Sequence, residues 1–136
     1  LMYFIVAAYV AQIAFALDET DGLEEYAEYA ERFPGEIFGS DAQIVSAADV
    51  TRGLFAALGG RLDDAVTLIG AGHALHERLE LHALAVDSGI DLATVLLRRD
   101  TPGDRDRAVG VLTTAADLAQ TLGMTPSAAR ARQLSA

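Results

Sequence analysis

The chain has 136 residues, of which 51% are hydrophobic, and it carries a formal net charge of −10 at pH 7. It contains neither cysteine nor lysine, which excludes a disulfide framework, a thiolate metal site and a phosphate-binding loop with its usual lysine. Residues 1–50 hold ten acidic residues against the single Arg32, and such a balance argues against binding to nucleic acid.

The opening segment, residues 1–17, is uncharged and apolar. It is short for a membrane span of about 20 residues, and it lacks the basic start of a signal peptide. We therefore expect a helix that neighbouring helices cover inside a longer array, in a chain cut from a larger cytoplasmic protein. Because the helix is apolar around its whole circumference, we also expect a homodimer joined through it if its outer side is left uncovered. The residues proposed for that contact are Phe4, Ile5, Tyr9 and Ile13.

A second helix is expected from about Gly22 until Pro34 ends it. Its apolar stripe consists of Leu23, Tyr26, Ala27, Ala30 and Phe33. Its other side carries Glu24, Glu25, Glu28 and Glu31. This acidic run favours a solvated face, with a docking strip for a basic partner as the alternative.

The stretch 35–44 is expected to be the longest irregular segment. The periodicity after it predicts helices over about 46–58, 62–79, 82–99, 105–122 and 125–133. The turns between them are marked by Gly59 and Gly60, by the run from Thr101 to Asp104, and by Gly123.

Residues 97–124 repeat residues 54–81 at an offset of 43 positions, and a weaker copy begins near Leu23. Leu54 with Leu97, Gly60 with Gly103, Asp63 with Asp106, Ala65 with Ala108 and Leu75 with Leu118 are among the identical pairs. A helix, a turn and a second helix are thus repeated. The pattern predicts an all-α fold, a tetratricopeptide-like superhelix of helical hairpins with about seven helices, as a single domain over residues 1–136.

The motifs of the repeats resemble a known family. The carriers of the resemblance are GRLDDA (60–65), HERL (76–79), LLRRDTPGDRDRA (96–108) and AQTLGM (119–124). They resemble the C-terminal tetratricopeptide-like repeats of large bacterial signalling ATPases, common in actinobacteria, that are joined to a nucleotide-cyclase domain or a LuxR-type regulator. The resemblance covers about residues 20–133 and implies a part in signal transduction or transcriptional regulation. None of that family's catalytic residues maps onto this chain. Glu80 and Leu84 stand where the family often has a glycine and an aromatic residue.

Two short motifs permit a catalytic or metal-binding alternative. Asp87-Ser88-Gly89 resembles an aspartic-protease motif, but it lies inside a predicted helix. His73, His76, Glu77 and Glu80 share one side of a helix and could in geometry hold zinc, although the spacing of HExxH is missing. A hydrolase or metal-binding domain is therefore a minor alternative to histidines at the edge of the core, and we expect neither a cofactor nor a metal.

The repeats favour a non-catalytic sensor or protein-interaction domain, because stacked hairpins present a concave groove to a ligand. The expected partner is a protein or a small-molecule effector, not nucleic acid or a membrane. The alternative is a structural spacer between an ATPase module and an output domain. A groove lined by polar and aromatic side chains such as Tyr26, Tyr29 and Arg52 would favour the sensor.

Overall fold

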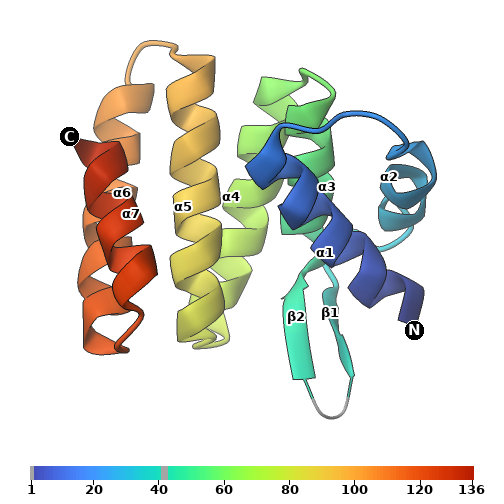
Figure 1. Ribbon diagram of the computed structural model, residues 1–136, viewed down its shortest axis with the longest axis horizontal. Coiled ribbons are helices and arrows are strands. Elements are labelled where there is room, and N and C mark those ends of the chain that lie inside the picture. Colours follow the sequence, from blue (N-terminus) through green and yellow to red (C-terminus); the bar gives the residue numbers. More distant parts are fainter. Residues whose placement is uncertain (1, 41–42) are drawn as a thin grey trace. The chain divides into compact units, whose positions relative to one another are not determined.

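Helices make up most of the chain in the computed structural model, which describes residues 2–40 and 43–136 (Figure 1). The described residues form seven helices and one two-stranded hairpin, so the expected all-α class with about seven helices is confirmed. The helices are α1 (Met2–Leu17), α2 (Glu24–Ala30), α3 (Ala48–Leu58), α4 (Leu62–Arg78), α5 (His82–Arg99), α6 (Asp104–Thr121) and α7 (Thr125–Ser135). The chain divides into two units, one ending at Gly72 and the other beginning at His73. The assignment of a single domain stays a prediction.

In the first unit, α1 packs through a face of small residues against α2, α3 and the hairpin. This buried face consists of Ala7, Ala8, Ala11, Ala14 and Phe15. Alanines there let the partner backbones approach closely. The opposite face is just as apolar but exposed. No helix of the described residues has the length and hydrophobicity to cross a membrane.

The expectation of an irregular segment at 35–44 is wrong. Strands β1 (Ile37–Ser40) and β2 (Gln43–Ala47) pair antiparallel there, and α3 begins at Ala48 instead of Ser46. The strands are short and Gly39 interrupts one of them, so the sequence gives little strand signal, although Phe38 and Val45 are buried and Ile44 is exposed. The register shifts after Phe38, as in a β-bulge. The hairpin thereby contributes buried side chains to the core that it shares with α1.

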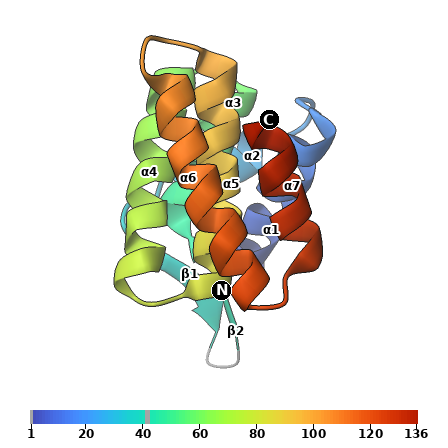
Figure 2. The same ribbon diagram turned by 90° about the vertical axis from the view of Figure 1, so that its left-hand side faces the viewer.

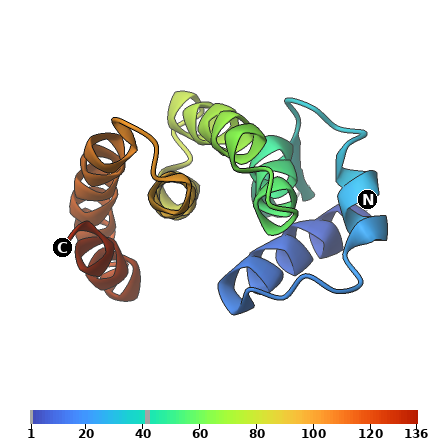
Figure 3. The same cartoon turned by 90° about the horizontal axis from the view of Figure 1, so that it is seen from above.

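Helices α3 and α4 lie side by side in the first unit (Figure 3), and two glycines stand where they meet. A Cβ atom built on Gly53 would lie 2.9 Å from the backbone nitrogen of Ile69, and one built on Gly72 would lie 2.8 Å from that of Val50. Each contact is too short for a real side chain, so both positions require glycine for the close approach of the two backbones.

The second unit consists of the end of α4 with α5, α6 and α7, which run in alternating directions (Figure 2). Gly123, with a φ of 74°, follows α6 as predicted, and Asp100, with a φ of 51°, ends α5 directly before the predicted turn from Thr101 to Asp104. The carboxylate of Asp104 accepts hydrogen bonds from the Arg99 guanidinium and from the backbone N–H and hydroxyl of Thr101. The Arg99 hydrogen bond, first among these, holds the pKa of Asp104 far below its usual range. The predicted turn is therefore locked by a charged hydrogen-bond network.

Candidate functional site

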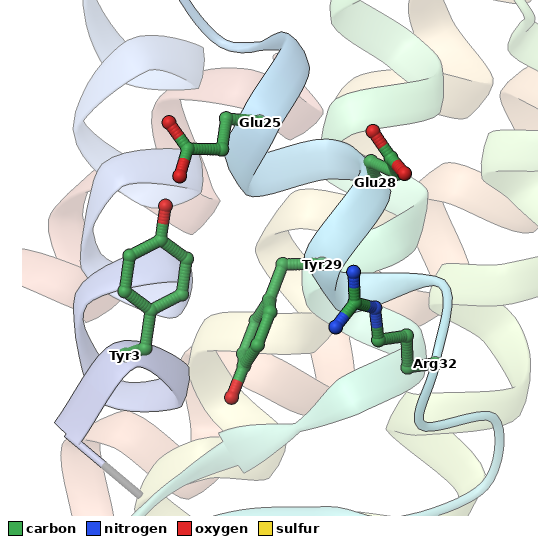
Figure 4. Close-up of a pocket in the computed structure, with 5 residues that line it drawn as sticks. All are labelled: Tyr3, Glu25, Glu28, Tyr29 and Arg32. Carbon is green, nitrogen blue, oxygen red and sulfur yellow. The ribbon is translucent and has the colours of Figure 1, made fainter.

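A pocket of about 270 Å³ lies between the start of α1 and one face of α2. Its walls are formed by Tyr3, Glu25, Glu28, Tyr29 and Arg32 (Figure 4). Each of the last four lies three or four positions from at least two of the others, which places them on one side of α2 and the turn after it. All of them belong to the first unit.

The aromatic rings of the pocket are held in place by one another. The rings of Tyr3 and Tyr29 meet edge to face, with centroids 4.6 Å apart and an interplanar angle of 72°. Tyr26 stacks on Tyr3 at 5.6 Å, and Tyr29 also meets the ring of Phe4 edge to face at 5.1 Å. Such arrangements suit the ring quadrupoles, so Tyr3 and Tyr29 present fixed surfaces to the pocket.

The pocket carries an excess of negative charge, because two carboxylates face one guanidinium. The Tyr3 hydroxyl points at the Glu25 carboxylate (Figure 4), and this hydrogen bond, followed by burial, raises the pKa of Tyr3 to about 12. Tyr3 is therefore a neutral donor at physiological pH. The guanidinium carbon of Arg32 lies 5.4 Å from the centroid of the Tyr29 ring, within the range of a cation–π contact.

The three residues proposed for partner binding do not converge on one site. Tyr29 lines the pocket and Tyr26 supports it from behind Tyr3. Arg52 lies in a second cavity of about 290 Å³, where its guanidinium is 2.8 Å from Glu31 and 2.7 Å from Asp49. Burial opposes the charge of Arg52, but the hydrogen bonds to these carboxylates outweigh burial and raise its pKa. Arg52 thus joins α3 to the end of α2.

Sequence reasoning missed Tyr3, Glu25, Glu28 and Arg32 as lining residues of one pocket. The available signal is the spacing of the glutamates with Tyr29 and Arg32, a pattern that favours a solvated face and has a docking strip as its alternative. Tyr3 had no such signal, since it belongs to a uniformly apolar helix.

The residues proposed for self-association separate into two pairs. Phe4 and Ile5 pack against the core formed by α1 and the hairpin. Tyr9 and Ile13 are 43% and 59% exposed. The rest of the exposed apolar face of α1 is provided by Met2, Val6 and Leu17.

In the second unit, His73 and His76 both point their Nδ1 atoms at the hydroxyl of Ser88, at 2.9 and 3.0 Å. That hydroxyl also donates a hydrogen bond to the backbone carbonyl of Leu84 at 2.8 Å. Ser88 is only 2% exposed. The Asp-Ser-Gly motif therefore places its serine in a structural hydrogen-bond network that substrate cannot reach.

The zinc alternative gains no support from this geometry, since the described residues contain no cluster of three or more ligands suited to a metal. Burial, reinforced by the neighbouring His73, lowers the pKa of His76 to about 4 despite a hydrogen bond to Leu84. Burial also lowers the pKa of His73, opposed by Glu77. Both imidazoles are neutral at physiological pH.

This neutrality predicts acid sensitivity. An unfolded histidine titrates near pH 6.5, so between about pH 6.5 and 4 the unfolded chain binds a proton at His76 whereas the folded protein does not. The free energy of unfolding should therefore be highest above pH 6.5 and should decrease by about 1–2 kcal/mol as the pH falls through this range. Urea unfolding at pH 7.0 and 4.5 measures the loss. The exposed control His82→Asn should retain the loss, whereas His76→Asn should reduce it. Equal pH dependence in all three proteins would contradict the assignment.

Comparisons with models of protein families, with curated proteins and with solved structures find no match to this chain.

Proposed function

We propose that the chain is a non-catalytic binding domain, the sensor or protein-interaction part of a larger cytoplasmic bacterial regulator of signalling or transcription. The observation that carries this proposal is the pocket of the first unit, in which exposed carboxylates lie beside fixed aromatic rings. Such groups recognise a ligand by charge and by ring surface. The resemblance of the repeats to those of bacterial signalling ATPases supports the same role, and a tetratricopeptide-like superhelix with a concave groove stays a prediction.

The two alternative functions, a hydrolase and a structural spacer, would each require a different structural feature. A hydrolase would need a nucleophile that substrate can reach, whereas the hydroxyl of Ser88 is buried and hydrogen-bonded to Leu84. A structural spacer would need no pocket, whereas about 270 Å³ of space is left open beside Tyr29. Binding is therefore the function that the described residues support best.

An NMR screen of the whole chain with cationic, anionic and neutral fragments tests this function. Binding predicts saturable shifts of backbone amides for one class of fragment and no chemical change in any fragment. Absence of saturable binding would favour the spacer, and turnover of an ester or amide fragment would favour the hydrolase.

The exposed face of α1 supports a second proposal, association with a second copy of the chain. Met2, Val6, Tyr9 and Ile13 follow each other at intervals of four, three and four residues, the spacing of a helix–helix seam. The helix carries no charged residue, so two copies can meet there without like-charge repulsion even though the chain is acidic. A two-fold axis would bring this stripe against itself.

Ile13→Glu is expected to convert the dimer to a monomer, because a charge buried in an apolar seam without a partner is strongly unfavourable. Light scattering coupled to size exclusion, at tens of micromolar protein, measures the mass. Leu122→Glu is the matched control, since Leu122 is also an exposed apolar residue near a helix end. A monomeric wild-type chain, or a dimer that survives Ile13→Glu, would contradict this proposal. Phe4 is unsuitable for the test because it belongs to the core.

A further inference from the structure

The pocket between α1 and α2 specifies the chemistry of its ligand, and this inference rests on the proposed binding function. Its walls combine the ring surfaces of Tyr3 and Tyr29 with the carboxylates of Glu25 and Glu28. Ring faces carry the negative part of the aromatic quadrupole, so rings and carboxylates attract the same kind of group. An anion would meet two carboxylates. A neutral apolar ligand would gain no attraction from the carboxylates. The pocket therefore selects an organic cation.

The position of Arg32 indicates which kind of organic cation the pocket favours. Its guanidinium lies against the face of Tyr29, with the carbon 5.4 Å from the ring centroid (Figure 4). The chain thus already places one guanidinium on a wall of the pocket. Arg32 follows α2 and is exposed, so solvent compensates its charge if another cation takes its place. A planar guanidinium both stacks on a ring and pairs with carboxylates in a way that a compact ammonium does not.

We propose that this pocket binds the guanidinium of an arginine side chain presented by a partner peptide, and that Arg32 is an intramolecular competitor for the Tyr29 ring. Two of the acidic residues of α2, Glu25 and Glu28, then belong to the binding site. The volume of about 270 Å³ is sufficient for one long side chain and not for a folded element.

Titration calorimetry of the whole chain tests the ligand class. The probe is N-acetyl-arginine methylamide, and citrulline with the same blocking groups is its neutral isostere. We expect the arginine compound to bind at least about tenfold more tightly than the citrulline compound, and more tightly than the lysine compound. Two further probes distinguish the sources of the arginine group: a Gly-Ser peptide with one arginine residue represents a partner peptide, and free arginine amide represents a small molecule. If the natural ligand is a partner peptide, the Gly-Ser peptide should bind at least as well as free arginine amide. Preference for free arginine amide would indicate a small-molecule effector instead and overturn the peptide assignment.

Substitutions of the residues that line the pocket test their contribution to arginine binding. Tyr29→Leu should weaken arginine binding about tenfold, whereas Tyr29→Phe, which keeps the ring, should bind like the wild type. Glu28→Gln should weaken binding about threefold. The matched control Glu24→Gln removes an equal charge from the same helix outside the pocket and should leave binding unchanged. Circular dichroism verifies the fold of each variant.

Arg32→Gln gives the most specific result. Removing the competitor and its positive charge should tighten arginine binding about threefold, whereas removal of a merely structural residue would not. Equal binding of citrulline, or weaker binding by Arg32→Gln, would overturn the proposal. If arginine fails while another fragment class binds saturably, this inference falls and the proposed binding function stands. If no fragment binds, both fall.

Discussion

Gly72→Ala should lower the free energy of unfolding by about 2–3 kcal/mol, because the added methyl group has no room between α4 and α3. Alanine is the better helix former, so propensity alone would make the substitution stabilising. The close approach to α3 reverses the sign, because the new Cβ would lie 2.6 Å from a side-chain carbon of Val50 and 2.8 Å from its backbone nitrogen. A side chain can rotate away, but the backbone of α3 must move.

Gly110→Ala is the matched control. Gly110 also lies inside a helix, α6, and a Cβ atom there would have no neighbour within 4 Å. Alanine at this position should raise the free energy of unfolding by about 0.5–1 kcal/mol. Urea unfolding followed by far-ultraviolet circular dichroism measures both. A stabilising effect at both glycines would show that α3 and α4 are not in backbone contact.

Phe38→Ala should be at least as severe, with a loss of about 3–5 kcal/mol. Phe38 is 2% exposed, and its ring lies 4.6 Å from that of Phe4 and 6.0 Å from that of Phe33, measured between centroids. Truncation removes these contacts and leaves a cavity between the hairpin and α1. Ile44, in the paired strand, is 46% exposed, and Ile44→Ala should change stability by less than about 0.5 kcal/mol. Equal effects in the same unfolding experiment would mean that the hairpin is not part of the core.

The helices from α4 onward could be predicted to within one or two residues, because each has a periodic stripe and a turn marked by glycine or proline. The hairpin could not, since its strands have only four and five residues and one contains Gly39. A glycine inside so short a run weakens the strand signal further. Pattern reasoning therefore worked where the signal extended over several turns.

The candidate site was only partly predictable for a different reason. Tyr29 and the glutamates share one side of a short helix, and their spacing is visible in the sequence. The contribution of α1 is not, because every side of that helix is apolar and nothing distinguishes Tyr3, in the pocket, from Tyr9, on the exposed face. Likewise, Ser88 meets two histidines twelve and fifteen positions away through the packing of two helices, which local periodicity does not specify.

Binding of the ligand at the α1–α2 pocket can be tested by mapping amide shifts in a titration with N-acetyl-arginine methylamide. We expect saturable shifts concentrated in the first turn of α1 and in residues 24–33, reduced by Tyr29→Leu and enhanced by Arg32→Gln. Shifts concentrated in α5, α6 or α7, or no saturable shift at millimolar probe, would contradict it.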